Sequence, residues 1–282
     1  MGINELAIFA ILALPPVAGW LFFWRKRLAE PEPAHVLAQL FLFGIFAALS
    51  LFILREYDFF SWAAPLVLLI FFAFLEESLK GLLLIGGVEL NKSHFDKWED
   101  GFEFAVLIAL GFAFTENIFY FFREFSAGGL SLDFWNLYLL RSLGTILAHT
   151  IFTGSFGYFY ACAFVAKKIV PKSKHEKPLA HFFRNLTKVL RRPFHITLCH
   201  LLSQKDSAHG HTSGEVVLEG LFLAIFLHAI FNAFLFFNPF EKSLAFLTVP
   251  ILIGGGWWYA VRFIPLRNRN IAICIFANWF YF

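Results

Sequence analysis

Long apolar stretches, separated by short charged segments, dominate the chain. A helix of about 20 apolar residues is long enough to cross a bilayer, and seven stretches reach roughly that length. These stretches are residues 5–24, 35–54, 62–90, 101–122, 138–166, 216–238 and 243–263. The pattern predicts an all-α fold, a polytopic transmembrane helical bundle with about seven spans. A further apolar segment, 271–282, is too short to span and is expected to lie at the interface.

Composition supports a membrane protein and argues against a soluble one. The 282 residues are 59% hydrophobic, 20% aromatic and only 15% charged, which is far from the usage of soluble globular domains. The three cysteines, Cys162, Cys199 and Cys274, are odd in number and widely spaced. They therefore indicate neither a disulfide framework nor a thiolate metal site.

The distribution of basic residues predicts the orientation. If the N-terminus lies outside, 18 of the 23 Lys and Arg residues fall on the cytoplasmic side. Three of them precede residue 28, two are at 92 and 97, ten lie from 167 to 205, and three from 262 to 269. Cytoplasmic loops carry an excess of Lys and Arg, so we expect the N-terminus outside.

The same pattern suggests how the chain is divided. Residues 1–61 form an N-terminal pair of spans, and 62–238 form a core that carries the intramembrane polar residues. A basic insert at about 167–214 interrupts this core on the cytoplasmic side. Residues 239–282 form a last span and the interfacial tail.

One predicted span contains three charged residues. Residues 70–84 read IFFAFLEESLKGLLL, with Glu76, Glu77 and Lys80 in the middle. Each charge at the centre of a membrane helix costs about 2.5 to 3.5 kcal/mol unless it is neutralised. Glu76 and Lys80 have the i, i+4 order that allows an ion pair. The group is therefore expected to face the bundle interior rather than lipid.

Other spans place polar residues at a similar depth. Glu116 and Asn117 lie in the fourth span, His149 in the fifth, and His228 and Asn232 in the sixth. Rows of small residues run along the same helices and are expected to face the interior, because small residues let membrane helices approach closely. These rows are Ala73 and Gly81; Gly101, Ala105, Ala109 and Ala113; Thr153, Gly157 and Ala161; and Gly220 and Ala224.

The polar residues allow more than one chemistry. Three carboxylates and one lysine sum to −2, which calls for two protons or one divalent cation. Glutamate and neutral histidine are ligands of catalytic zinc, which leaves one position open for water, and such a site suits peptide hydrolysis. A proton or cation pathway uses the same residue types. Isolated intramembrane His and Asn residues also serve simply as hydrogen-bonded packing residues.

Five motifs, in order along the third to sixth spans, carry a resemblance to a known family. They are EESLK at 76–80, DG at 100–101, GFAFTEN at 111–117 with Tyr120, Arg141 ahead of His149, and HAIFN at 228–232. Together they resemble the PrsW family of intramembrane metalloproteases. That family is similar to the CAAX prenyl endopeptidases and to bacteriocin-immunity-type membrane proteins. The resemblance extends over about residues 62–238.

The resemblance implies a helical bundle with its site inside the bilayer and a metal-dependent peptidase that cuts membrane-anchored proteins, with the cofactor expected to be zinc. It implies roles for nine residues. Expected catalytic residues are Glu76, Glu77 and Asn232; expected metal ligands are Glu116, His149 and His228; expected supporting residues are Lys80, Asn117 and Arg141. One of Glu76 and Glu77 would activate water, and Asn232 would donate to the oxyanion.

These observations lead to a prediction with two alternatives. We predict an intramembrane endopeptidase of a bacterial-type cytoplasmic membrane, acting on a membrane-anchored protein and not on nucleic acid. The alternatives are a proton or cation transporter built on the same polar core, and a catalytically silent immunity or scaffold protein. Glu77 lies in the same i, i+4 row as the small residues Ala73 and Gly81. We therefore expect Glu77 to be more deeply engaged at the site than Glu76.

Overall fold

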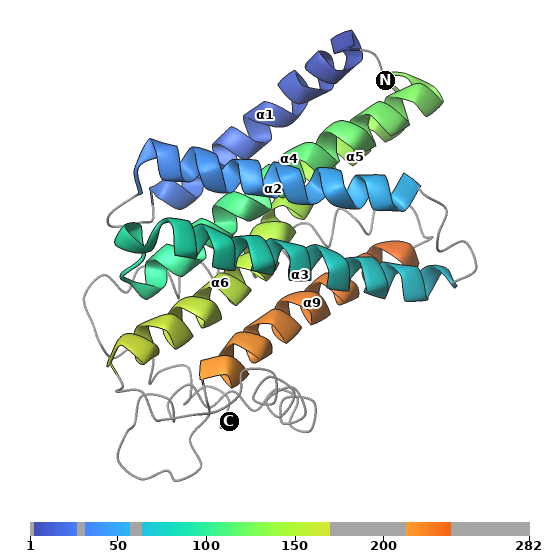
Figure 1. Ribbon diagram of the computed structural model, residues 1–282. Coiled ribbons are helices and arrows are strands. Elements are labelled where there is room, and N and C mark those ends of the chain that lie inside the picture. The colour runs from blue at the N-terminus through green and yellow to red at the C-terminus, as the bar shows by residue number, and fades with distance from the viewer. Residues whose placement is uncertain (1–2, 27–31, 57–63, 170–212, 238–282) are drawn as a thin grey trace.

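A computed structural model of the protein describes residues 3–26, 32–56, 64–169 and 213–237. All secondary structure in these ranges is helical, and no strand occurs in them (Figure 1). The helices are α1 (Ile3–Arg25), α2 (Ala34–Glu56), α3 (Pro65–Leu90), η1 (Lys92–His94), α4 (Trp98–Gly128), α5 (Leu132–Leu139), η2 (Leu140–Thr145), α6 (Ile146–Ile169) and α9 (Ser213–Phe237). The all-α prediction is confirmed for this part of the chain.

Among the described residues, four helices are long and apolar enough to cross a membrane. These candidate spans are Asn4–Arg25, Ala34–Leu54, Glu99–Gly128 and Val216–Phe236. Helices α3 and α6 occupy the stretches predicted as the third and fifth spans. The stretch 243–263, the tail 271–282 and nearly all of the insert 167–214 lie outside the described residues. The count of seven spans therefore stays a prediction, as do the interfacial tail and the cytoplasmic insert.

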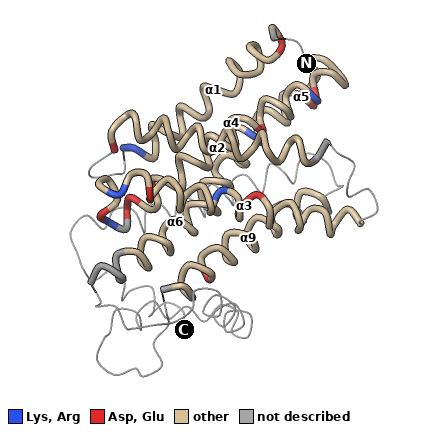
Figure 2. Tube along the Cα trace, in the orientation of Figure 1, with Lys and Arg blue, Asp and Glu red and all other residues tan. Residues whose placement is uncertain are grey.

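Helix α4 is the centre of the bundle. Helices α1, α2, α3 and α6 pack against it, and α9 packs against α3 and α6. In the most apolar 18-residue stretch of α4, 83% of the residues are buried, compared with 17% in the corresponding stretch of α1. Charged residues gather mainly near helix ends, and few lie in the middle of helices (Figure 2). The exceptions in the middle of α3, Glu76, Glu77 and Lys80, are buried among the packed helices.

Glycines set the closest helix crossings. A Cβ atom on Gly44 of α2 would collide with the backbone of α4 at Ile108 and Phe112, and one on Gly101 of α4 would collide with Gly157 of α6. The rows of small residues predicted to face the interior are buried throughout. That prediction is confirmed, and the physical reason is close backbone approach.

A tight turn and a π-helix shape the link from α4 to α6. Gly129 adopts φ 65°, a conformation that favours glycine, and ends α4. Ser131 caps α5 by accepting a hydrogen bond from the Phe134 N–H at 3.2 Å. The chain then runs without a break through the π-helix η2 into α6. Such π segments occur frequently at functional sites, and this one carries Arg141.

Candidate metal centre

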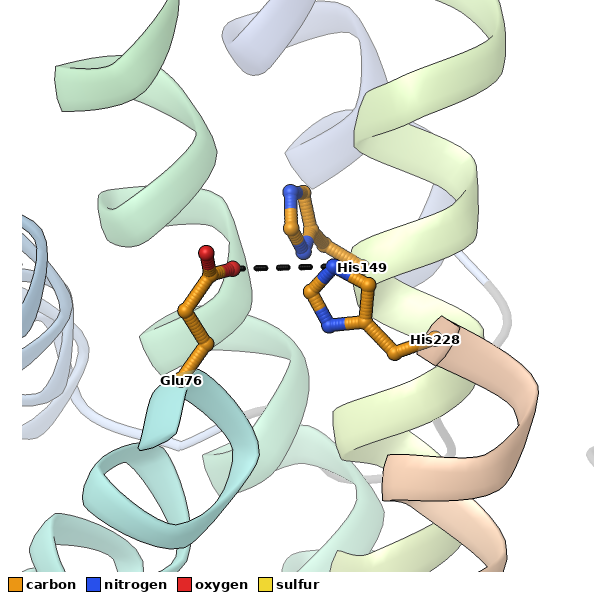
Figure 3. A group of neighbouring side chains, drawn as sticks. All are labelled: Glu76, His149 and His228. Carbon is orange, nitrogen blue, oxygen red and sulfur yellow. Dashed lines mark ion pairs between the residues drawn. The ribbon is translucent and has the colours of Figure 1, made fainter. Parts of the chain in front are cut away.

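Three buried side chains from three helices converge in the bundle interior. Glu76 comes from α3, His149 from α6 and His228 from α9, and they point toward one another (Figure 3). Each is at most 2% exposed. Each offers one ligand atom, and these atoms all lie within 4.8 Å of one another. Residues 152 positions apart in sequence thus form one compact donor set.

His228 is oriented by a second carboxylate. Its Nδ1 lies 2.8 Å from Oε1 of Glu77, and an ionised carboxylate can only accept, so Nδ1 carries the hydrogen. Nε2 then presents its lone pair toward Oε2 of Glu76, 3.6 Å away. This separation is too long for a hydrogen bond. It is close to the roughly 3.4 Å that separates two ligand atoms on a tetrahedral zinc ion with bonds of about 2.1 Å.

Glu77 is held by three donors. Its Oε1 accepts from Lys80 at 2.5 Å and from His228, and its Oε2 accepts from the hydroxyl of Thr153 at 3.0 Å. Lys80 thus pairs with the carboxylate three residues before it, whereas the sequence pattern offered Glu76 as its partner. The Glu77 carboxylate is positioned to fix the His228 ring, as carboxylates beside metal-binding histidines commonly do.

Lys80 also contacts the second histidine. Its Nζ lies 3.2 Å from Nδ1 of His149 and 4.2 Å from the centre of the Phe112 ring. An ammonium group only donates, so Nδ1 accepts and Nε2 carries the hydrogen. Nε2 lies 3.1 Å from Oε2 of Glu116 and donates to it. A metal bound through either nitrogen of His149 would replace one of these two contacts.

Glu116 belongs to a second polar group centred on Arg141. The Arg141 guanidinium donates from NH2 to Oε2 of Glu116 and from Nε to Oδ1 of Asn117, both at 2.8 Å. Its Cζ atom also lies 3.8 Å from the centre of the Tyr120 ring. Arginine holds a planar fork of donors, so the π-helix residue fixes both α4 side chains.

The charge balance differs from that inferred from sequence. Arg141 joins Lys80 in facing the three carboxylates, so the formal charge is −1 with neutral histidines. Three carboxylates and Lys80 alone sum to −2, and the sequence does not show that the helix with Arg141 reaches Glu116. A cation still improves the balance, but charge alone does not demand a divalent one.

The structure brings eight of the nine predicted residues into one connected cluster. They are Glu76, Glu77, Lys80, Glu116, Asn117, Arg141, His149 and His228. Asn232 lies one turn beyond His228 on α9 and is half-buried. In the part of the chain that the structure describes, no hydrogen bond joins its side chain to the cluster. Its oxyanion role stays a prediction.

The donor set fits zinc, with one change in membership. The carboxylate grouped with His149 and His228 is Glu76 rather than Glu116. One Glu and two His ligands, all buried, are a known catalytic zinc set that leaves a fourth position for water. The ligand role expected for Glu116 stays a prediction, and its contacts with Arg141 and His149 suit a different role.

A cavity of about 620 Å³ reaches this centre between α2, α3 and α4. Glu76 and Glu116 both line it, whereas Glu77 does not. Ligand pockets of roughly 300 to 1,000 Å³ are typical for binding sites. The two carboxylates that a bound molecule would meet are therefore Glu76 and Glu116.

Sequence reasoning missed three residues that support the cluster. Thr153 donates to Glu77, Phe112 lies beneath Lys80, and the ring of Phe152 stacks on that of His228 at 5.3 Å between centroids. Thr153 follows His149 by one turn in a row already expected to face the interior, so its hydroxyl gave a usable signal. The two phenylalanines gave none, because phenylalanine is common throughout these spans.

Comparison with known proteins places the chain in a family. The profile of the PrsW family intramembrane metalloproteases matches residues 32–184. Similar curated proteins are Protease PrsW of Clostridioides difficile (strain 630) and Protease PrsW of Bacillus subtilis (strain 168). The first is 28% identical over 161 residues, covering 55% of this chain and 65% of the relative. The second is 30% identical over 119 residues, covering 40% and 54%.

The chain thus spans less than two thirds of the length of either relative. No solved structure matches it. The matched residues include Glu76, Glu116 and His149, while His228 lies beyond them and is joined to the cluster by the fold alone. Because the family match covers more than half of the chain, the protein, a multi-pass membrane protein by its apolar helices, belongs to the PrsW family of intramembrane metalloproteases.

Proposed function

We propose that this protein is a metal-dependent endopeptidase that cuts a membrane-anchored protein within or beside the bilayer. The observation that carries the proposal is the buried set of Glu76, His149 and His228, with ligand atoms within 4.8 Å, beside a cavity that reaches it. Membership of the PrsW family and relatives named as proteases support the same reaction class.

Glu76, His149 and His228 would hold a divalent metal, and zinc suits their donor types. Zinc so held supplies a Lewis acid and makes a water molecule acidic enough to serve as a nucleophile near neutral pH. Glu77 keeps Nε2 of His228 directed toward the metal position by accepting from Nδ1 at 2.8 Å. Lys80 offsets the charge of Glu77 in a region without solvent.

Glu116 is the best-supported proton acceptor for the attacking water. It lines the cavity and is 13% exposed, and Arg141 holds it in place. Glu77 has both oxygens bound by three donors and does not line the cavity. General bases must reach the proton that they remove. This geometry supports Glu116 rather than Glu77 as the general base, and it supports Glu76 as a metal ligand.

The remaining parts of the proposal follow the family resemblance and the charge pattern. Asn232 lies one turn after His228 on α9 and would donate to the developing oxyanion. The protein would lie in a bacterial cytoplasmic membrane with its N-terminus outside, because most basic residues then lie inside. The C-terminal ends of α2 and α4 would then face outward.

Reconstitution in liposomes tests this function. Purified protein is assayed both for cleavage of candidate single-span membrane proteins and for proton or cation flux, alongside Glu116→Gln. The proposal expects cleavage that the variant loses and no flux. Flux without cleavage, lost in the same variant, would identify a transporter and overturn the proposal. Neither cleavage nor flux, with the metal still bound, would indicate a silent protein.

A further inference from the structure

The cavity extends away from the metal centre along α4. Its lining on α4 runs from Phe112 past Glu116 and Phe119 to Arg123 and Ser126. Glu116 and Arg123 are seven residues apart, which is two helical turns, so both lie on one face about 10 Å apart along the axis. One end of the cavity thus carries the two carboxylates Glu76 and Glu116, and the other carries a cation.

The cavity lies beside a close contact between α2 and α4. At Gly44 and Gly111 the two backbones touch, since a Cβ on either would collide with the other helix. Eight residues further along each helix, the rings of Phe52 and Phe119 stack between them, with centroids 3.7 Å apart and planes at 7°. Both rings also line the cavity, so its walls between the two ends are apolar and aromatic.

Arg123 differs from the other arginine near the centre. Arg141 is buried and bound to Glu116 and Asn117. Arg123 is exposed, and within the ranges that the structure describes it makes no ion pair or hydrogen bond. A cation at the rim of an apolar cavity can bind an anionic group of whatever enters the cavity. Its charge is therefore available to an occupant rather than used by the fold.

The inner end of the cavity indicates what that occupant is. A phospholipid would match the apolar walls and Arg123, but its hydrocarbon tail would end against Glu76 and Glu116. A hydrocarbon tail would displace water from the cavity-facing parts of these carboxylates and supply no hydrogen-bond donor in its place, which is costly. An extended polypeptide supplies backbone N–H donors at that end and side chains along the walls. The two ends of the cavity together fit a peptide better than a lipid.

We propose that the cavity binds an extended segment of the protein substrate and that Arg123 selects an acidic residue in it. The inference rests on the proposed endopeptidase function and names a specificity residue for it. An extended chain advances about 3.3 Å per residue, so the roughly 10 Å from Glu116 to Arg123 corresponds to about three residues. The acidic substrate residue lies about three positions from the cleaved bond. It belongs to the part of the substrate that extends from Glu116 toward the C-terminal end of α4.

A substrate library tests the inference. The probe is a set of single-span membrane proteins with one fixed apolar helix and randomised flanking residues, reconstituted with the purified protein. Cleavage positions are read by mass spectrometry of the fragments. Wild type should favour Asp or Glu about three residues from the cut by about 10-fold in kcat/KM over Asn, the size of a charged hydrogen bond. Arg123→Glu should favour Lys or Arg there, and Arg123→Lys should retain the acidic preference.

Control measurements separate the possible outcomes. Lys92→Glu, which alters an exposed cation in a surface pair with Glu89, should leave the preference unchanged. Cleavage without acidic preference, or a preference that Arg123→Glu does not alter, would overturn the role of Arg123 and keep the protease. If Arg123→Glu loses copurified phospholipid while the preference for an acidic substrate residue is unchanged, the molecule bound in the cavity is a lipid. Absence of any cleavage by metal-loaded protein would overturn both the inference and the proposed function.

Discussion

Glu77 and Glu116 are both carboxylates of one polar cluster, but their surroundings differ in kind. Glu77 is 1% exposed and is enclosed by Lys80, Thr153 and His228. Glu116 is 13% exposed, is held by Arg141 and faces the cavity. The closed group uses its charge to orient a histidine, whereas the open group keeps a charge where a bound molecule can reach it.

The cations of the two groups differ in the same way. Lys80 has a compact ammonium group, and its buried Nζ atom contacts Glu77, His149 and the face of the Phe112 ring. Arg141 is a planar fork that fixes Glu116 and Asn117 together and stacks on Tyr120. The two side chains are not interchangeable. The comparison teaches that stability should depend most on the closed group and the reaction on the open one.

The largest expected effect is on the reaction, from a change in the open group. Glu116→Gln keeps the shape of the side chain but removes its ability to accept a proton. We expect cleavage to fall by about 10²- to 10⁴-fold, the range typical of general base catalysis. Initial rates of substrate cleavage in liposomes measure this. An equal loss in Glu77→Gln together with full activity in Glu116→Gln would reverse the assignment.

The next effect is on stability, from a change in the closed group. Glu77→Leu leaves Lys80 charged and buried without its partner, and breaking a buried pair costs about 3 to 5 kcal/mol. The double variant Glu77→Leu with Lys80→Met should recover much of that loss, because both charges are then removed. Unfolding in detergent measures both. Glu89→Gln on the same helix is the control, since its pair with Lys92 is more than half exposed and should contribute about 0 to 1 kcal/mol.

A smaller effect separates the two cations. Arg141→Lys keeps the charge but cannot hold Glu116 and Asn117 with one planar fork. Hydrogen bonds to charged groups contribute about 1.5 to 3 kcal/mol, so cleavage should fall by about 10- to 100-fold while the protein stays folded. The rate and the unfolding midpoint are measured on the same preparation. Unchanged activity would show that charge alone fixes Glu116.

The smallest effect tests a contact that only the fold reveals. Thr153→Val removes the hydroxyl that donates to Oε2 of Glu77 and preserves the shape of the side chain. Losing one hydrogen bond to a buried acceptor should cost about 1 to 3 kcal/mol of stability. Cleavage by the folded fraction should change little, because Oε1 still orients His228. A loss of activity as large as that of Glu116→Gln would place Thr153 in the reaction.

Sequence patterns predicted the helices well because the bilayer imposes a simple length rule. The boundaries of α2 and α9 differ from the predicted stretches by only a few residues. The π-helix η2 was missed, since residues 140–145 have no composition that distinguishes them from an ordinary helix. It matters because it carries Arg141 to Glu116.

The site was predicted in part for similar reasons. Charged residues in apolar runs are costly, so Glu77 and Lys80 stood out without a structure. Spacing within α3 lets Lys80 reach either Glu76 or Glu77, and the carboxylate that Arg141 meets depends on how two helices cross, which spacing does not specify. The Lys80 partner and the Arg141 contact were therefore assigned only by the fold. The cavity is lined by residues of α2, α3 and α4, and their coming together is not encoded by any local pattern.

The central claim is that Glu76, His149 and His228 hold a metal ion, and metal analysis tests it most directly. Wild type, His228→Ala, Glu76→Gln and the control Thr153→Val are purified in parallel and their metal content is measured against protein concentration. The account predicts about one zinc per chain in wild type and in the control, and a loss of at least about 10-fold in affinity when a ligand is removed. Metal-free wild type that still cleaves its substrate, or zinc retained equally in His228→Ala and Glu76→Gln, would contradict the claim.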